Sequence, residues 1–223
     1  MSEHTALVLG ATGLIGGHCL QLLLQDSQYS TVHAVVRKPL TSSHPKLQQH
    51  AIDFAGLGAL VTQLAPSVVF CCLGTTIGKA GSNEAFRRVD YEYPLAAAQA
   101  AAQAGCAQFL LVTAIGASAE SSVFYNRVKG EVERDISALP LPSVHIARPS
   151  MLLGERSERR IGESIGKALM LATSPLMLGG ARKYRPIAGL TVAKALISLA
   201  RTAEKGRHIY ESDALERLGS ALR

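Results

Sequence analysis

Three glycines separate two apolar segments near the amino terminus, in the stretch TALVLGATGLIGGHCLQLLLQ. The first segment ends at Gly10, and a second apolar pattern with helical spacing resumes beyond Gly13 and Gly16. Gly10 permits a tight turn, Gly13 keeps side chains away from a pyrophosphate, and Gly16 lets the helix approach the strand. The N-terminus of such a helix presents bare N–H groups to the phosphates. The stretch therefore predicts a dinucleotide site, and the alternative is a strand-to-helix turn that binds no ligand.

Short β-like segments alternate with longer helical ones along the rest of the chain. This alternation predicts parallel strands joined by helical crossovers, and the continuous apolar runs are typical of strands covered on both faces. We expect an α/β fold, a doubly wound parallel sheet over about residues 1–150. The predicted strands are 6–10, 31–36, 50–53, 67–74, 108–114 and 143–148.

The pattern loosens after Pro149. The tail contains a predicted helix with Thr191 as its N-cap that ends near Ala203, followed by a strand-like segment, RHIYE. We expect about residues 151–223 to pack over the carboxyl edge of the sheet as a small substrate-binding portion. Because the chain shows no internal repeat and no low-complexity linker, residues 1–223 are predicted to form one NAD(P)-binding domain.

Composition excludes several classes of protein. Hydrophobic residues make up 48% of the 223 residues and charged residues 18%, which argues against disorder. The opening residues MSEHTALVLG contain no basic region of the kind that begins a secretory signal peptide. No segment reaches the roughly 20 apolar residues that a membrane helix needs. We therefore expect a soluble, cytoplasmic protein with no membrane contact.

Cysteine spacing and net charge limit the classes of ligand that the protein can have. The four cysteines show no CxxC spacing and lie in apolar runs, so we predict reduced core thiols and no metal site. The formal net charge of +6 comes from scattered basic residues, with few aromatic residues and no nucleic-acid-binding motif. We predict no nucleic-acid partner, and a basic pocket for an anionic small molecule explains the charge equally well.

The residues after the second and third predicted strands bear on cofactor choice. NAD-binding sites commonly place an acidic residue after the second strand, whereas this strand runs into Arg37 and Lys38. A carboxylate would repel a 2′-phosphate and a guanidinium binds one, so we predict that NADP(H) is preferred and NAD(H) possible. The alternative is that Arg37 is a solvated charge. Asp53 is predicted either to accept a hydrogen bond from the adenine amino group or to be an ordinary turn acid.

Tyr125 and Lys129 are four positions apart at the start of a predicted helix, so both project from one face. A nearby ammonium favours the phenolate, which makes Tyr125 a candidate acid–base group and Lys129 its activator and a ligand of the nicotinamide ribose. Thr113, at the end of the preceding strand, is a candidate ligand of the substrate oxygen. The alternative is an exposed Tyr–Lys helix face and a threonine that ends a strand.

Several motifs together resemble a known superfamily. The segments GATGLIG, CCLGTT, the Tyr125–Lys129 pair and RPSMLLG are similar to those of the short-chain dehydrogenase/reductases. LGTTIGKAGSNEAFRRVDYEY, FYNRVKGEVE and RPSMLLGERSERR resemble more closely its atypical branch, the Tat-interacting-protein-like oxidoreductases. The resemblance covers nearly the whole chain.

The resemblance implies a Rossmann-type fold with NADP(H) bound across the carboxyl ends of the strands, and Tyr125 and Lys129 in the catalytic positions. Relatives tend to carry serine before the catalytic helix, whereas this chain has Thr113 followed by Ala114. One hydroxyl is preserved, but fewer groups can stabilise the substrate oxygen. The implied cofactor-binding residues are Gly10, Thr12, Gly13, Leu14 and Ile15 for the pyrophosphate, Arg37 for the 2′-phosphate, Cys72, Leu73 and Gly74 for the middle of the cofactor, and Pro149 and Ser150 beside the nicotinamide.

Two functions follow from these patterns. The first is an NADP-dependent oxidoreductase that transfers a hydride to or from a carbonyl or alcohol of a small-molecule substrate. The second is a catalytically silent protein that senses NADP(H) and binds a protein partner. The alanine-rich stretch PLAAAQAAAQAGC permits close helix packing, either in a homodimer, as the resemblance implies, or against the chain's own sheet.

Overall fold

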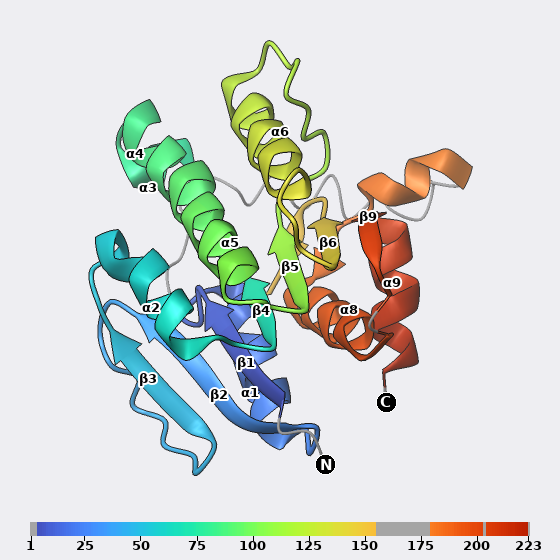
Figure 1. The fold of residues 1–223 in the computed structure, drawn as a ribbon. Coiled ribbons are helices and arrows are strands. Elements are labelled where there is room, and N and C mark those ends of the chain that lie inside the picture. The colour runs from blue at the N-terminus through green and yellow to red at the C-terminus, as the bar shows by residue number, and fades with distance from the viewer. Residues whose placement is uncertain (1–3, 155–178, 203, 223) are drawn as a thin grey trace.

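A sheet of seven strands forms the centre of the computed structural model, which describes residues 4–154, 179–202 and 204–222. All its neighbouring strands are parallel, in the spatial order β3-β2-β1-β4-β5-β6-β9 (Figure 1). The order reverses between β1 and β4, and an open α/β sheet binds ligands at such a point, outside the carboxyl ends of its strands. The strands are β1 (His4–Leu9), β2 (Tyr29–Val36), β3 (Leu47–Ala51), β4 (Val68–Cys71), β5 (Gln108–Val112), β6 (Ser143–Arg148) and β9 (Gly206–Glu211).

Helices cover both faces of the sheet (Figure 1). One face carries α1 (Leu14–Gln25), α8 (Gly189–Thr202) and α9 (Ser212–Ala221), and the other carries α2 (Leu57–Leu64), α5 (Tyr93–Gln103) and α6 (Phe124–Ser137). Short elements connect them: η1 (Phe54–Gly56), α3 (Ile77–Ala80), α4 (Asn83–Arg87), the π-helical turn η2 (Arg88–Glu92), η4 (Gly179–Tyr184) and the strand pair β7 (Leu152–Leu153) and β8 (Ile187–Ala188).

Strand β1 shows why the central strands are continuous apolar runs. Ala6 and Val8 pack into the core that contains α1 and α8, whereas Leu7 and Leu9 pack into the core that contains α2 and α5. All four side chains are fully buried. Successive side chains of a strand point to opposite faces, so a strand that is covered on both faces carries mostly apolar residues at successive positions. The predicted doubly wound sheet is confirmed.

Some element boundaries differ from the prediction. The third strand lies at Leu47–Ala51, three residues before the predicted 50–53, because its polar sequence LQQHA at the sheet edge carries little apolar signal. Helix α8 begins at Gly189, before Thr191, and its predicted end at Ala203 falls outside the described residues. Helices α2 and α9 were not predicted.

The carboxyl-terminal segment is built into the main body. Strand β9 extends the sheet beside β6, and α8 packs against α1. The expectation that the whole tail lies over the carboxyl edge of the sheet is therefore wrong for these two elements. Residues 155–178, which include the ERSERR part of the last family motif, lie outside the described residues.

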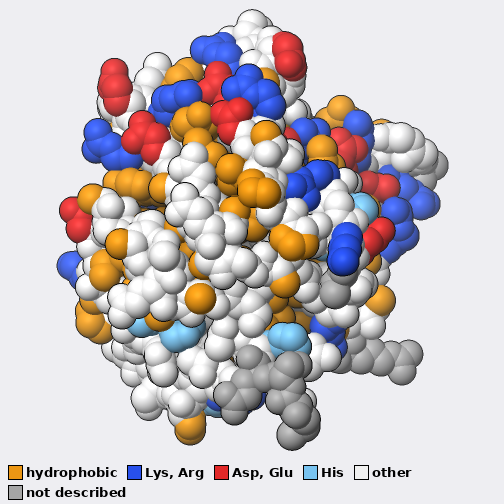
Figure 2. All heavy atoms as spheres, in the orientation of Figure 1, with side chains coloured by type: hydrophobic (Ala, Val, Ile, Leu, Met, Phe, Trp, Pro, Cys, Tyr) orange, Lys and Arg blue, Asp and Glu red, His pale blue; other side chains and the backbone are white. Residues whose placement is uncertain are grey.

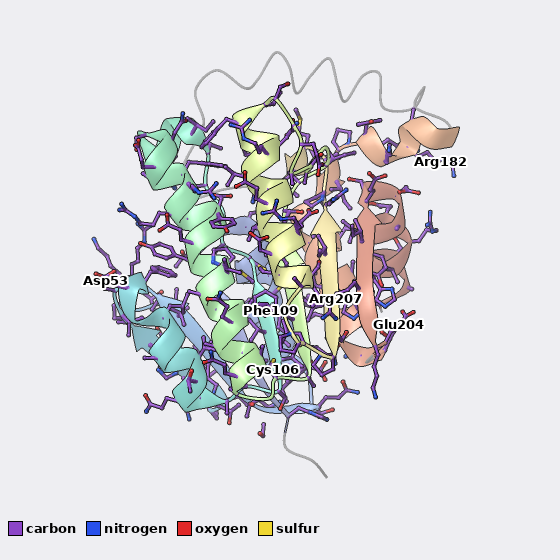
Figure 3. The ribbon with its side chains drawn as sticks, turned by 45° about the horizontal axis from the view of Figure 1, so that its top comes forward. Asp53, Cys106, Phe109, Arg182, Glu204 and Arg207 are labelled. Atoms are coloured by element: carbon purple, nitrogen blue, oxygen red, sulfur yellow. The ribbon has the colours of Figure 1, made fainter. Side chains whose placement is uncertain are left out.

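Alanines of α5 are used within the chain itself. Ala97, Ala98, Ala100 and Ala101 are buried in the same core as Phe109 of β5. Figure 3 shows Phe109 on its strand behind the helices of that face. This packing supports the simpler of the two expectations for the alanine-rich stretch, and the homodimer stays a prediction.

Charged side chains gather at one end of the molecule. Figure 2 shows Lys and Arg interleaved with Asp and Glu over the region where Figure 1 places α4 and α6. On this face the two signs of charge alternate and do not form a single basic patch. Among the helices of the described segments, none is both long and apolar enough to cross a bilayer.

Candidate active site

Close backbone approaches shape the turn after β1. Gly10 has φ +82°, which side chains disfavour, and a Cβ there would lie 2.6 Å from the carbonyl oxygen of Cys72. A Cβ on Gly16 would lie 2.2 Å from the carbonyl oxygen of Gly10. The Gly13 N–H closes the turn by donating to the Gly10 carbonyl at 2.9 Å, and Thr12 between them is exposed. The first turn of α1 is therefore held directly at the end of β1.

Helix α1 offers backbone groups at this end. No residue of its first turn is acidic, and within the described ranges no side chain caps it at Gly13. The Leu14 side chain lies against Gly154 and Gly189, where an added Cβ would come within 2.7 Å and 2.6 Å of its methyl and methine carbons. Ile15 is buried in the core. The predicted phosphate contacts of Leu14 and Ile15 can therefore come only from their N–H groups.

The segment after β4 runs beside the glycine turn. The Cys72 N–H donates to the Leu9 carbonyl at 2.9 Å, Leu73 is buried and Gly74 is exposed. A hydrogen bond with Cys19, together with burial, raises the pKa of the Cys72 thiol well above its usual value. Cys72 is therefore a neutral thiol and not a reactive thiolate.

Tyr125 and Lys129 lie one helical turn apart on α6, beside a buried carboxylate. Lys129 Nζ is 2.7 Å from Asp90 Oδ1, and the two side chains are only 5% and 0% exposed. Burial lowers the pKa of Lys129, but the charges of Asp90 and Tyr125 outweigh burial and leave it raised. A Cβ on Gly74 would lie 3.5 Å from Asp90 Oδ1 and 3.7 Å from Lys129 Nζ. The Tyr125 ring packs on Phe86 with the ring centroids 5.3 Å apart.

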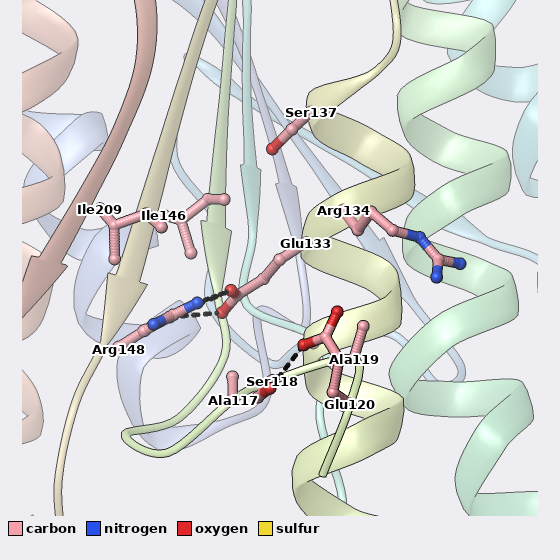
Figure 4. Close-up of a pocket in the computed structure, with 11 residues that line it drawn as sticks. Ala117, Ser118, Ala119, Glu120, Glu133, Arg134, Ser137, Ile146, Arg148 and Ile209 are labelled. Atoms are coloured by element: carbon pink, nitrogen blue, oxygen red, sulfur yellow. Dashed lines mark hydrogen bonds and ion pairs between the residues drawn. The ribbon is translucent and has the colours of Figure 1, made fainter.

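Thr113 faces a different carboxylate. Its hydroxyl donates to Glu133 Oε1 at 2.5 Å, and Glu133 also accepts hydrogen bonds from the Arg148 guanidinium, including one of 3.0 Å from Nε (Figure 4). Both Thr113 and Glu133 are buried. A hydroxyl has one proton to donate, and here that proton is used by Glu133. This contact joins the end of β5 to α6 and leaves the Thr113 oxygen only as an acceptor, so it argues against a hydrogen bond donated to the substrate oxygen, and the role of Thr113 stays a prediction.

A hollow of about 310 Å³ lies between α6, β6 and β9 (Figure 4). Ile146, Arg148 and Ile209 line it together with Glu133. Across the described segments neither Tyr125 nor any residue of the glycine turn lines it, so it is separate from both of these parts of the candidate site. Its wall carries the Arg148–Glu133 ion pair and also the charged residues Glu120 and Arg134.

Arg37 and Lys38 are both exposed directly after β2. Asp53 precedes η1, and its carboxylate accepts a hydrogen bond from the Ala55 N–H at 3.4 Å. Figure 3 shows Asp53 at the outer edge of the molecule. Of the two roles predicted for Asp53, this geometry favours the turn acid.

Pro149 and Ser150 connect the end of β6 to other segments. The Pro149 carbonyl accepts from the Ile115 N–H at 3.0 Å, and the Ser150 N–H donates to Ser212 Oγ at 2.8 Å. The Ser150 hydroxyl donates to the Arg185 carbonyl. Their position beside the nicotinamide stays a prediction.

Sequence reasoning missed Asp90 and Glu133. Glu133 had a local signal, since it lies four positions after Lys129, as Lys129 lies four after Tyr125, and all three therefore share a helix face. Asp90 had no local signal in the sequence, because its partner Lys129 lies on α6, far along the chain.

Comparison with known proteins places this site in a family. A family model described as NAD(P)H-binding matches residues 10–155, from the glycine turn to beyond the end of β6. The chain belongs to this NAD(P)H-binding family. "Protein FMP52-1, mitochondrial" of Scheffersomyces stipitis is 36% identical over 229 residues, which cover 98% of this chain and 100% of the relative. "Protein HTATIP2" of Rattus norvegicus is 32% identical over 228 residues, covering 98% and 90%. The predicted membership of the atypical, Tat-interacting-protein-like branch of the short-chain dehydrogenase/reductases is confirmed.

Solved structures of other proteins share the fold. A 4-hydroxyisoleucine dehydrogenase complexed with NADH has a TM-score of 0.68 at 15% identity, with 94% of this chain and 97% of that chain covered. At these identities the likeness shows the Rossmann-type architecture and no more.

The cytoplasmic location expected from the sequence is wrong in the light of the relatives. FMP52 proteins of several yeasts carry "mitochondrial" in their names. The amino-terminal sequence had argued against a secretory signal only, and that argument does not address import into an organelle.

Proposed function

We propose that this chain is an NADP-dependent oxidoreductase that transfers a hydride to or from a carbonyl or alcohol of a small molecule. The observation that carries the proposal is the buried, charged Lys129 one helical turn from Tyr125 and close to Gly74. Gly74 follows the carboxyl end of β4, and ligands of open α/β sheets bind outside these strand ends.

The glycine turn fits a dinucleotide. The first turn of α1 has no acidic residue, and the backbone approaches at Gly10 and Gly16 leave no room for side chains. A pyrophosphate would accept hydrogen bonds from the N–H groups after Gly13 and would meet the positive end of the helix dipole. The nicotinamide of a bound cofactor supplies or receives the hydride.

Tyr125 moves the proton in this proposal. Tyr125 lies one helical turn from the ammonium of Lys129, and its hydroxyl is the group of the pair that can exchange a proton with a substrate oxygen. In the direction of reduction the Tyr125 hydroxyl donates its proton to the carbonyl oxygen, and in oxidation the phenolate accepts the proton of the alcohol. Lys129 remains protonated throughout and holds the charge beside the reacting atoms.

Arg37 supports a preference for NADP(H). It is the first residue after β2 and is exposed, so its guanidinium can reach a 2′-phosphate at the edge of the nucleotide site. A guanidinium binds the oxygens of a phosphate through two parallel hydrogen bonds, whereas a carboxylate here would repel it.

The test is a fluorescence titration of the wild type and Arg37→Asp with NADPH and with NADH. We expect the preference for NADPH to fall about tenfold or more, since one charge-assisted hydrogen bond contributes about 1.5–3 kcal/mol. Arg217→Asp is the matched control, because it makes the same charge change at a 71%-exposed side chain on α9. An Arg37→Asp protein that kept the preference would contradict the assignment.

A second candidate function is the silent NADP(H) sensor that binds a protein partner. The specific observation in its favour is Thr113, whose hydroxyl is bound to Glu133, followed by Ala114, which has none. The two candidates differ in turnover with quinones, aldehydes and ketones. We expect the wild type to consume NADPH with a member of this panel and Tyr125→Phe to bind NADPH without consuming it. Tight binding without turnover by the wild type would favour the sensor.

A further inference from the structure

Asp90 is a buried charged residue for which the proposed chemistry has no role. It is 1% exposed, its Oδ1 lies 2.7 Å from Lys129 Nζ, and its Oδ2 accepts from the Thr75 N–H at 2.9 Å. We propose that Asp90 is the positioning residue of the Tyr125–Lys129 pair: its carboxylate fixes the ammonium of Lys129, in its charged form, beside Tyr125 and Gly74. The proposal rests on the proposed function, since it assigns how that site is assembled.

The local fold directs the Asp90 side chain toward the interior. Asp90 lies in the π-helical turn η2, and such turns, inserted within helices, often lie at functional sites. Residues on either side of it bind the outer surface of α6: Arg87 pairs with Glu131 at 2.5 Å, and the Tyr91 hydroxyl donates to Asp135 at 2.8 Å. The first contact holds the end of α4 against α6, and the second holds η2 against it. Asp90, between them in the sequence, reaches the interior.

The interior has no other carboxylate for Lys129 among the described residues that interact with it. The groups that face its ammonium are Asp90 from η2, Tyr125 from α6 itself and Cys71 from β4. Burial raises the pKa of the Cys71 thiol to about 12, so Cys71 remains neutral. Burial without an opposite charge nearby lowers the pKa of a lysine by as much as about 3–5 units, so such a lysine loses its proton much more easily. Asp90 is therefore what keeps this lysine charged.

Asp90 does not act on the reacting atoms. The negative charge of Asp90 lies next to the Lys129 ammonium, so it partly offsets the electrostatic effect of that ammonium on Tyr125. What it provides is a fixed place and a stable charge for Lys129. Oδ2 is in turn anchored by the Thr75 N–H, so the carboxylate is held at both oxygens, with Thr75 in the segment that follows Gly74.

The experiment is an NMR titration of the Lys129 side-chain nitrogen in the full-length protein, labelled with ¹⁵N at lysine Nζ. The Lys129 signal is assigned by its absence from Lys129→Met. We expect the wild-type Lys129 to titrate above the ordinary lysine value, and the midpoint to fall by about two pH units or more in Asp90→Asn, because burial then acts without a counter-charge.

Asp135→Asn is the matched control. It also removes a carboxylate that joins η2 to α6, but it leaves Lys129 and Asp90 in place, so its titration should match the wild type. Equal midpoints in Asp90→Asn and the wild type would overturn the proposal. A wild-type Lys129 that loses its proton near about pH 8 would also overturn it, and this result needs no variant to fold. The titration uses no cofactor and no turnover, so it decides the role of Asp90 separately from the dinucleotide titrations that decide the proposed function.

Discussion

The Gly16→Ala substitution tests the close approach of α1 to the turn after β1. The new Cβ would lie 2.2 Å from the Gly10 carbonyl oxygen, whereas ordinary van der Waals contact begins at 3.4 Å. Helix and turn must therefore separate by about 1.2 Å, the difference between these two distances. Both contacting parts are backbone, so no side chain can rotate away to relieve the overlap.

Gly17→Ala isolates this contact from the general effect of alanine in a helix. Gly17 is the next residue of α1, and its added Cβ would lie at 3.4 Å from the nearest atom, the Ala11 carbonyl oxygen. Both substitutions gain about 0.5–1 kcal/mol of helix stability, because alanine loses less backbone entropy than glycine. Overpacking of the interior costs about 1–3 kcal/mol. We therefore expect Gly16→Ala to be less stable than Gly17→Ala by about 1–3 kcal/mol.

The measurements are urea unfolding of both variants and fluorescence titration with NADPH. A shift of about 1.2 Å moves the N–H groups of α1 out of hydrogen-bonding distance from a pyrophosphate, so we expect Gly16→Ala to bind NADPH at least about tenfold more weakly. Gly17→Ala should bind it as the wild type does. Equal stability of the two variants within about 0.5 kcal/mol, together with equal affinity for NADPH, would refute the reasoning.

Three further predictions concern stability. Burial, with His208 nearby, lowers the pKa of His145 to about 4, so the neutral ring stabilises the fold above pH 6.5 and this contribution is lost as pH falls toward 4. Acid unfolding should show a loss of at most about 2 kcal/mol from this group, which His145→Gln should remove. Gly130→Ala should destabilise by about 2 kcal/mol or more in urea unfolding, because its Cβ would lie 2.1 Å from backbone atoms of Ser118 and Ala119. Phe109→Ala should cost about 3–5 kcal/mol in the same assay, and a loss below about 1 kcal/mol would contradict its place in the core.

Sequence patterns predicted the fold where burial on both faces dictates composition. The strands β1, β4, β5 and β6 are mostly apolar because both faces are covered, and each was predicted at about its place along the chain. Strand β3 lies at the sheet edge with side chains that are half-buried or exposed, so its polar residues carried too weak a signal to fix its boundaries. Helix α8 begins at a glycine, a residue that more often follows a helix than starts one.

Local spacing also predicted the parts of the site that depend on one element. Two residues one turn apart on a helix must share a face, so Tyr125 and Lys129 could be paired from sequence. The hydroxyl of Thr113 could not be oriented in this way, because the direction of a side chain at a strand end is set by partners on other elements. Asp90 lies 39 positions before Lys129, and only tertiary packing brings the two together.

The face of α6 that carries Tyr125 and Lys129 continues to Glu133, and the way these residues pair explains the site's geometry. Lys129 and Glu133 are four positions apart with opposite charges, a spacing that often gives a pair on one helix. Here each binds a partner on another element: Lys129 binds Asp90 of η2, and Glu133 binds Arg148 of β6. These two ion pairs, one buried and one partly buried, therefore fix the rotation of α6 about its axis. Since Tyr125 lies on the same face, its direction follows from both pairs, and loss of either should reorient it.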